Sequence, residues 1–402
     1  MNGIKGLDSS TRLTLIVCAL LSLSSPAPAQ AFSVIHSFGP STGSKPHSGV
    51  TIDAHGNLYG TTFFGGQNAN GVVYKLSRHG SSWIYSVLHE FTGSDGAQPV
   101  AKPLIAPNGT LYDTATAGGM FQDGTLVNLR PQPNRCSSIS CPWQATVIHS
   151  FALSSDGSSP VGINFDPAGD IIGATLAGGG KSEGTIFKLT PSQGSWTFSL
   201  LTDFSGSNAG DAYGGVISDS QGNIYGAGYY ELPGSIFEIT SSGQLEVLYQ
   251  FPFSGANGVG LDYGLVQDQA GNLYGMAAGG GQLGGGTVYE LSPSGGSWSL
   301  AVLHNFPSFV LGAATGSASL TLDAEGNLYG TTFANGTFGL GNVFKLTPSS
   351  GGWTYTDLYD FTGEADGCLP WSDVVMDASG NLYGTTEQCG SSGAGTVWEI
   401  TP

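Results

Sequence analysis

The chain of 402 residues is acidic and poor in charged side chains, with a formal net charge of -18 and only 10% Asp, Glu, Lys and Arg. An acidic surface of this kind repels phosphate backbones, so we expect no nucleic-acid partner. Its 65 glycines would indicate low complexity if they were scattered, but they recur at regular intervals along the chain.

Residues 1–31 are typical of a secretory signal peptide. Lys5 and Arg12 precede the apolar run LTLIVCALLSLSS, and the small-residue segment PAPAQA follows it, which predicts export and cleavage after Ala29 or Ala31. The apolar run is too short for a membrane span, and nothing like it occurs later. We therefore expect a mature chain without a membrane span, secreted or held in the periplasm or cell envelope.

One motif recurs through the rest of the chain. The heptapeptide GNLYGTT occurs at 56–62, 326–332 and 380–386, and related segments lie between these copies. Alignment on the first glycine of the motif gives Gly56, Gly109, Gly169, Gly222, Gly271, Gly326 and Gly380, with spacings of 53, 60, 53, 49, 55 and 54 residues. Seven units leave no remainder, so one repeat architecture must account for the whole mature chain.

Each unit is predicted to form four short strands. In the first unit, GVTID, NLYGTT, GVVYKLS and WIYSVLHEF are rich in β-branched and aromatic residues and are bounded by Gly, Asn and Asp. No segment shows helical periodicity. Four antiparallel strands per unit match a β-propeller blade, whereas a β-helix rung would be roughly half as long. We predict an all-β, seven-bladed propeller that forms a single domain over 32–402.

The two ends of the chain predict how the ring closes. The segment FSVIHSF at 32–38 matches a fourth strand, whereas the last unit ends at GTVWEITP, which matches a third strand. Pairing of these two strands would close the ring and remove exposed sheet edges. The predicted blades are 46–91, 97–151, 158–204, 212–251, 261–306, 316–361, and 369–402 completed by 32–38.

Two units, GNLYGTTFANGTFGLGNVFKLTPSSGGW and GNLYGMAAGGGQLGGGTVYELSPSGGSW, resemble the GloVer-type tandem repeat of exported, choice-of-anchor bacterial proteins. The family pattern is close to GNLYGTT, a glycine-rich loop, GTVFKLTP, then Gly and Trp. The resemblance covers all seven units and is weakest in units 2, 3 and 4. It implies the repeat architecture and no particular reaction, because the family is defined by its repeats.

Features that recur through most units are interpreted as structural. An Asp three residues before the motif glycine is expected to accept backbone N–H groups in a short hairpin, and no D-x-D-x-D-G calcium loop occurs. The second motif glycine, Gly60 in the first unit, is expected to allow close backbone approach beside the innermost strand. Four histidines occupy one slot of the fourth strand, where other units have Tyr249 or Tyr359, and this interchange indicates packing: His36, His89, His149 and His304. We predict no metal site and no cofactor.

Tryptophan and cysteine divide between repeated and unique positions. Five tryptophans open fourth strands and are expected to pack between blades: Trp83, Trp143, Trp196, Trp298 and Trp353. Cys368 and Cys389 lie in loops that a propeller places on one face, so we expect a disulfide between them. Cys136 and Cys141 share one long loop and are the other candidates for oxidation, with the connectivity left open.

Residues that depart from the repeat around the channel mouth form the candidate ligand site. In unit 4 the usual Gly-Gly is replaced by Tyr229, Tyr230 and Glu231, and Trp371 fits no repeat slot. Aromatic rings and carboxylates together suit sugars, although ordinary loop variation in an acidic protein would give the same residues. The candidate ligand-binding residues are Lys102, Tyr213, Tyr229, Tyr230, Glu231, Asp262, Tyr263, Trp371, Asp373 and Glu387.

The sequence favours an exported, monomeric, non-catalytic binding protein whose partner is a polysaccharide or another envelope or extracellular protein. One alternative is a carbohydrate-active hydrolase or lyase that uses carboxylates at the mouth. The other is a purely structural protein of the cell envelope. No G-x-S-x-G, S-x-x-K or P-loop occurs, so no catalytic residues are identified.

Overall fold

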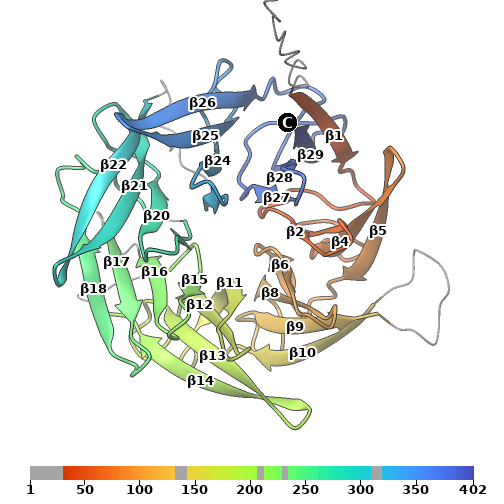
Figure 1. The fold of residues 1–402 in the computed structure, drawn as a ribbon. Helices are drawn as coiled ribbons and strands as arrows, with labels where there is room; N and C mark the ends of the chain where they lie inside the picture. Colours follow the sequence, from red (N-terminus) through yellow and green to blue (C-terminus); the bar gives the residue numbers. More distant parts are fainter. Residues whose placement is uncertain (1–29, 132–142, 206–211, 229–233, 262, 309–318) are drawn as a thin grey trace, which may run out of the picture.

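In the computed structural model, seven antiparallel sheets surround a central axis as the blades of a propeller (Figure 1). The structure describes residues 30–131, 143–205, 212–228, 234–261, 263–308 and 319–402. Within these ranges the regular elements are β-strands, and no helix is long and apolar enough to cross a membrane. The fold class predicted from the repeat is confirmed.

The strands of each blade follow one another from the axis outward. Blade 1 contains β2 (Thr51–Ile52), β3 (Leu58–Thr62), β4 (Val72–His79) and β5 (Ser82–Glu90). Blade 2 contains β6 (Ala97–Pro99) and β7 (Leu104–Ile105), which both pair with β8 (Leu111–Ala117), then β9 (Thr125–Arg130) and β10 (Gln144–Ser150). Blade 3 contains β11 (Ser158–Phe165), β12 (Ile171–Ala177), β13 (Thr185–Ser192) and β14 (Ser195–Asp203).

The remaining blades repeat this order. Blade 4 contains β15 (Val216–Ser218), β16 (Ile224–Gly228), β17 (Ser235–Ile239) and β18 (Leu245–Gln250). Blade 5 contains β19 (Val266–Gln267), β20 (Leu273–Ala277), β21 (Gly284–Ser294) and β22 (Ser297–Pro307). Blade 6 contains β23 (Thr321–Leu322), β24 (Leu328–Thr332), β25 (Asn342–Ser349) and β26 (Gly352–Asp360). Blade 7 contains β27 (Val375–Met376), β28 (Leu382–Thr386), β29 (Thr396–Thr401) and β1 (Ala31–Ser37).

Blade 7 is built from both ends of the chain, as predicted. β1 lies antiparallel to β29, with Phe32 opposite Ile400 and Ser37 opposite Thr396. The ring of Phe32 stacks on Tyr359 of the preceding blade with 3.7 Å between centroids. The N-terminal strand thus covers the edge that β29 would otherwise expose and also joins blade 7 to blade 6.

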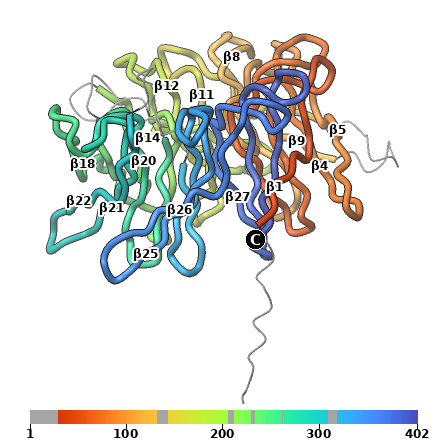
Figure 2. Tube along the Cα trace, turned by 90° about the horizontal axis from the view of Figure 1, so that it is seen from above, coloured from red at the N-terminus to blue at the C-terminus, as the bar shows by residue number. Residues whose placement is uncertain are grey.

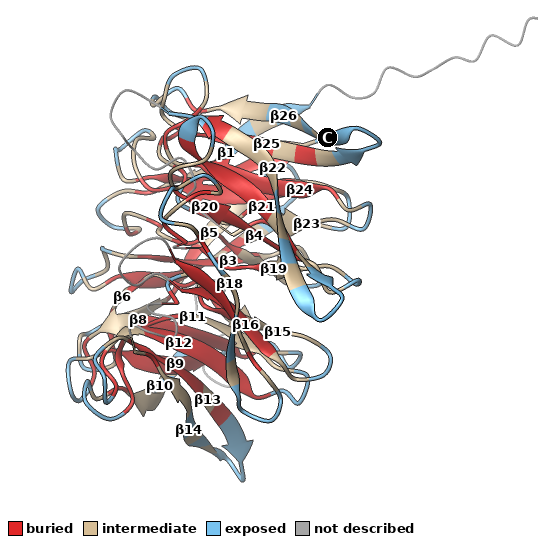
Figure 3. Cartoon of the chain, turned by 90° about the vertical axis from the view of Figure 1, so that its left-hand side faces the viewer, coloured by how far each residue is buried: buried red, intermediate tan, exposed pale blue. Residues whose placement is uncertain are grey.

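The disc has two different faces (Figure 2). On the hairpin face, short turns join the first strand to the second in every blade, and the third to the fourth in blades 1, 3, 4, 5 and 6. On the mouth face, longer loops join the second strand to the third and each blade to the next. The middle strands are buried over most of their length, whereas the outer hairpin tips are exposed (Figure 3). Function-specific variation therefore has the most room in the loops of the mouth face.

In six of the seven blades an Asp organises the turn between the first and second strands, whereas blade 2 has Ala106 there and Asn108 accepts the Thr110 N–H. In blade 1, Asp53 Oδ1 accepts hydrogen bonds from the backbone N–H groups of His55 and Asn57, and Oδ2 accepts bonds from the Asn57 amide and the Tyr59 hydroxyl. Burial alone would raise the pKa of Asp53, but these bonds outweigh it and lower that pKa below its ordinary value. Gly56 in the same turn has φ +76°, which a glycine adopts without strain. The predicted turn is confirmed, and Asn and Tyr of GNLYG belong to it.

The same tyrosine also holds neighbouring blades together. The Tyr59 ring meets Trp143 of the next blade edge to face at 6.2 Å, and Tyr383 of blade 7 meets Trp83 of blade 1 in the same way at 6.0 Å. The first Thr of the motif adds a hydrogen bond across the same junctions, since Thr61 Oγ1 donates to the carbonyl of Ala101 at 2.9 Å. The motif therefore joins its own turn to the adjacent blade. The prediction that the tryptophans at the start of fourth strands pack between blades is confirmed for Trp83 and Trp143.

The second glycine of the motif makes room for an aromatic ring. A Cβ added to Gly60 would lie 2.3 Å from the Tyr74 hydroxyl, and one on Gly330 would lie 2.7 Å from Cζ of Phe344. We expected this glycine to allow close approach of another backbone segment, and that prediction was wrong, because the group close to it is a side chain. The neighbour is the side chain of the third strand, which faces the glycine in register.

Blade 2 departs from this rule. Asp113 takes the place of the glycine and faces Val127, which takes the place of the aromatic residue. Asp113 is fully buried, its Oδ1 accepts a bond from the Thr114 N–H, and its Oδ2 has no hydrogen-bond partner among the described residues. Burial raises the pKa of this carboxyl well above its usual range, although the Thr114 bond acts against the rise. Burial therefore favours the protonated, uncharged form of Asp113 in the folded protein.

The histidine slot of the fourth strand is a packing position. The rings of His36 and His304 stack on Tyr85 and Tyr355 of the following blade at 4.2 and 4.4 Å. His149 stacks on the next blade in the same way and also hydrogen-bonds an Asp in the following loop. Tyr359 makes the corresponding bond from its hydroxyl. The position requires a flat ring that stacks on the next blade and a polar atom that bonds the following loop. His and Tyr both provide these, which explains why they exchange there.

Candidate ligand-binding site

One group of side chains gathers on the mouth face where blades 6, 7 and 1 meet. We name it the mouth cluster, and its members are Lys45, His47, Phe63, Phe333, Trp371 and Glu387. Lys45 and His47 precede β2, Phe63 and Phe333 directly follow β3 and β24, Trp371 precedes β27, and Glu387 directly follows β28.

Trp371 presents the aromatic surface of the cluster. Its side chain is 37% exposed, Phe333 meets its ring edge to face at 4.8 Å, and the centroid of His47 lies 6.2 Å away. The chain reaches this position through Leu369, whose φ of +55° is rare for a residue with a side chain and whose N–H donates to the Leu340 carbonyl. The indole thus has Phe333 and His47 beside it, while part of its surface stays open to solvent.

The polar part of the cluster is a nearly buried carboxylate between two bases. Glu387 is 6% exposed, with Lys45 Nζ at 3.4 Å and His47 Nε2 at 3.7 Å from Oε1. Burial lowers the pKa of His47, Glu387 acts in the opposite direction, and the charge of Lys45 lowers it further. His47 is therefore neutral at pH 7, and Lys45 is the counter-ion of Glu387. Beside the indole, the imidazole and the carboxylate offer hydrogen-bond acceptors and one donor.

Lys102 and Asp373 lie at the axis and bind each other. Lys102 Nζ is 2.7 Å from Asp373 Oδ2, and Asp373 Oδ1 accepts the Ser319 N–H at 3.1 Å. Both were predicted to bind a ligand, and the structure pairs them with each other as an ion pair between blades 2 and 7. Neither charge is left uncompensated for a ligand.

The other predicted site residues divide into three groups. Tyr213, which precedes β15 on the mouth face, is 52% exposed. Tyr263 is only 7% exposed because it packs with Met276 and Leu320 between blades 5 and 6, so the prediction that its ring is available at the mouth was wrong. Four predicted residues lie outside the described part of the chain: Tyr229, Tyr230, Glu231 and Asp262.

The predicted disulfide between Cys368 and Cys389 is present, with 5.3 Å between the Cα atoms. It ties the segment that leads to Trp371 to the loop that follows Glu387, and a backbone bond from Cys368 N–H to the Gln388 carbonyl accompanies it. The disulfide thus fixes the blade 7 half of the mouth cluster. Cys136 and Cys141 lie outside the described residues. Within the described ranges, no three His, Cys, Asp or Glu side chains gather as they would around a metal ion.

Sequence reasoning missed Lys45, His47, Phe63 and Phe333. His47 occupies the same entry position in blade 1 that Trp371 occupies in blade 7. Phe63 and Phe333 each follow an intact GNLYGTT, so the residue directly after the motif is the position that indicates membership of the cluster. These positions become meaningful once adjacent blades are compared, because the cluster forms across blade junctions.

Exposed apolar side chains concentrate on the same face. Twelve large ones are exposed in the described part of the chain, and all but Val34, Leu200 and Val247 belong to mouth-face loops. The nine are Phe64, Met120, Phe121, Leu153, Tyr213, Phe253, Leu283, Phe338 and Trp371. Such enrichment on one face is typical of a binding surface.

Comparison with protein families agrees with the repeat pattern. The model of the Gloeobacter/Verrucomicrobia repeat matches residues 22–231, 136–321 and 262–402, which overlap to cover nearly the whole chain. The chain belongs to this family. A search of curated proteins returned no significant match for this Gloeobacter/Verrucomicrobia repeat protein.

Solved structures similar to this repeat protein are distant propellers. An extracellular domain assigned to a one component system of B. thetaiotaomicron has a TM-score of 0.55 and 12% identity, covering 91% of this chain and 39% of that one. The extracellular domain of a hybrid two component system of the same organism gives 0.54 and 15%, with coverages of 93% and 42%. The polysaccharide lyase Uly1 gives 0.51 and 11%, covering 94% of each chain. The chain thus spans about two fifths of the first two structures, and these likenesses show the fold alone.

Proposed function

We propose that this protein is an exported, non-catalytic, monomeric binding protein that holds a polysaccharide on its mouth face. The observation that carries the proposal is the half-open indole of Trp371, fixed by Phe333 and placed beside His47 and Glu387. A sugar offers an apolar C–H face to an aromatic ring and hydroxyl groups to polar neighbours, and the mouth cluster contains both kinds of partner.

The wider mouth face supports a polymeric ligand over a single sugar ring. Exposed aromatic side chains occur on loops of several blades, including Phe64, Phe121 and Phe338 in addition to Trp371. A chain of sugars lying across the face could contact several such rings, each adding a small contribution. The acidic net charge of the protein favours a neutral or basic polysaccharide over an acidic one.

Export is supported by the chemistry of the cysteines and by the leader-like N-terminal sequence. Disulfides form and persist in oxidising compartments, and the Cys368–Cys389 bond lies within the proposed binding face. A location outside the cytoplasm would also bring the protein to extracellular and envelope polysaccharides.

The alternative of a carbohydrate-active hydrolase or lyase depends on carboxylates at the mouth. Asp373 is held by Lys102 and Ser319, and Glu387 is nearly buried against Lys45 and His47. These partners satisfy the carboxylates as structural groups, so the binding function is the better supported of the two.

A glycan array followed by calorimetry tests the proposal. Wild-type protein should bind at least one polysaccharide, and Trp371→Ala should weaken that binding about tenfold, which corresponds to about 1.4 kcal/mol. Leu200→Ala is the control, because Leu200 is 42% exposed on the outer strand β14 and should leave binding unchanged. The proposal fails if the wild type binds no glycan or if both variants bind like the wild type. Release of reducing ends that Glu387→Gln abolishes would favour the enzyme.

A further inference from the structure

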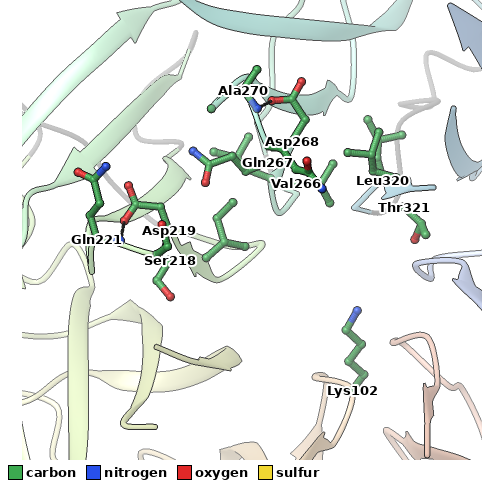
Figure 4. A pocket seen from close by; sticks show the side chains of 16 residues that line it. Lys102, Ser218, Asp219, Gln221, Val266, Gln267, Asp268, Ala270, Leu320 and Thr321 are labelled. Atoms are coloured by element: carbon green, nitrogen blue, oxygen red, sulfur yellow. Dashed lines mark hydrogen bonds between the residues drawn. The ribbon is translucent and has the colours of Figure 1, made fainter. Parts of the chain in front are cut away.

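A second concavity lies in the central channel, on the side of the hairpin face. It has a volume of about 780 Å³ and is lined by residues 217–221 of blade 4, 265–271 of blade 5 and 320–322 of blade 6. Lys102 of blade 2 faces these blades from across the channel (Figure 4). No member of the mouth cluster lines it, so the hollow is separate from the proposed polysaccharide site. Its volume falls within the range of pockets that hold small ligands.

The wall of the hollow presents unpaired main chain. β15, β19 and β23 are the innermost strands of their sheets, and each pairs with only one neighbour. The other edge of each strand therefore directs N–H and C=O groups toward the channel, where they can bond a ligand. Apolar side chains between these edges, such as Ile217 and Val266, supply the C–H surface on which a ligand can rest.

The charged groups of the hollow are already compensated. The Asp219 carboxylate accepts bonds from Gln221, Asn223 and Tyr225, and Asp268 is held by its own turn in the same way. Lys102 is paired with Asp373. A charged ligand would therefore have to disrupt an existing ion pair or hairpin to gain a partner.

Uncharged hydrogen-bonding groups, in contrast, are available. The side-chain amides of Gln221, Gln267 and Gln269 line the hollow and make no hydrogen bond within the described ranges of the chain. An amide both donates and accepts, as does a sugar hydroxyl. Free amides, open strand edges and an apolar floor complement a molecule with hydroxyl groups on every side and no charge.

We propose that this hollow is a second ligand site, for a small uncharged polyhydroxylated molecule such as a mono- or disaccharide. Gln267 is the central contact, because it projects from the innermost strand of the middle blade of the three. The site is independent of the polysaccharide site on the mouth face, so either could exist without the other.

Methyl NMR of the full chain tests this site directly. Glucose and cellobiose should shift the methyl signals of Ile217, Val266 and Leu320 in a saturable manner, whereas glucuronate and glucosamine at equal concentration should not. Gln267→Leu, which keeps the side-chain size and removes the amide, should weaken glucose or cellobiose binding at least tenfold. Gln282→Leu, an exposed position on a mouth-face loop, should not.

The outcomes separate the two sites. Trp371→Ala should leave the shifts of the hollow unchanged, so loss of polysaccharide binding at the mouth does not bear on this proposal. The proposal is overturned if neither neutral sugar moves the three methyl groups or if Gln267→Leu binds as well as the wild type. It is also overturned if a charged sugar binds the hollow as tightly as its neutral counterpart.

Discussion

The hairpin face and the mouth face are made by the same repeats, yet they differ in how much they vary. Five hairpins carry the same Asp, Asn and Tyr side chains with the same bonds, and their Asp residues are Asp53, Asp219, Asp268, Asp323 and Asp377. The mouth loops, in contrast, share glycines in most blades but vary much more in their other residues. The difference shows that repetition here marks the parts that build the ring and that departures from it mark candidate binding groups.

Blade 3 shows how far the hairpin can change and still close. Its motif has Asp170 and Ile172 where other blades have Asn and Tyr, so the Tyr hydroxyl is missing. Lys188 of the third strand fills the gap, with Nζ at 2.7 Å from Asp166 and 2.8 Å from Asp170. Where the first Asp is present, both of its carboxylate oxygens are therefore bonded, and the identity of the partners is secondary.

The largest effect is expected from moving the blade 2 arrangement into blade 6. Gly330→Asp would place a side chain within 2.7 Å of the Phe344 ring and bury a carboxyl group. We expect a loss of about 4 kcal/mol in unfolding free energy or no soluble protein, since overpacking and an unpaired buried polar group both apply. Adding Phe344→Val should recover part of the loss in urea denaturation. Equal stability of Gly330→Asp and wild type would contradict the glycine–aromatic pairing.

A smaller effect is expected from removing one hairpin carboxylate. Asp323→Ala takes away the acceptor of the Glu325 and Asn327 N–H groups and of the Tyr329 hydroxyl, and should cost about 2 kcal/mol at pH 7. Burial would raise the pKa of Asp323, but the bonds from Asn327, Tyr329 and Glu325 outweigh it and lower that pKa. Its contribution is therefore present above the unfolded pKa and is lost as the pH falls through the lower folded value.

The control for that hairpin is Glu325→Ala. The Glu325 side chain is exposed in the same turn, so its removal should change the unfolding free energy by no more than about 0.5 kcal/mol. Denaturation of both variants at pH 7 and pH 3 should show a difference between them that shrinks at the lower pH. A difference independent of pH would mean that the carboxylate charge does not hold the turn.

The contribution of Asp113 to the unfolding free energy should depend on pH in the opposite direction to that of Asp323. Because burial raises its pKa in the folded protein, the folded state holds a proton that the unfolded state releases above pH 4. Wild-type stability should therefore fall relative to Asp113→Asn as the pH rises from about 4 toward 8, by about 1.4 kcal/mol for each unit between the folded and unfolded pKa values. Parallel unfolding curves for the two proteins at pH 5 and pH 8 would show that Asp113 ionises normally.

The smallest effect is expected at the axis. A double-mutant cycle with Lys102→Met and Asp373→Asn should give a coupling energy below about 1 kcal/mol, because both side chains are partly exposed to the channel water. The coupling should weaken further in 1 M salt. A coupling of several kcal/mol would make this pair part of the ring's scaffold and not a local feature of the channel.

The fold was predictable because the seven copies of the repeat could be compared with one another. Seven motif glycines fixed the number of blades, and the matching of 32–38 to a fourth strand predicted the closure. The turn role of Asp53 also followed from sequence, whereas the Tyr59 bond to it did not, because it joins residues whose side chains meet only after the hairpin forms.

The candidate site was only partly predictable. Trp371 and Glu387 were identified as departures from the repeat, but their partners His47 and Phe333 come from the neighbouring blades. Tyr263 was misplaced because position along a loop does not show which side chains turn inward between blades. Contacts between side chains of adjacent blades depend on three-dimensional geometry. A single sequence predicts such contacts only where the repeated motif itself makes them.

The pairing of β1 with β29 also governs when the molecule can fold. Ala31 and Thr401, which are joined by a hydrogen bond, lie 370 residues apart, so the propeller's first strand in chain order pairs with its last. Contacts of such separation slow folding, and the ring stays open until the C-terminal strand has emerged. A chain that stops early keeps an unpaired sheet edge, which is a template for aggregation. Ring closure therefore distinguishes a finished propeller from one that lacks its last strand before any ligand is bound.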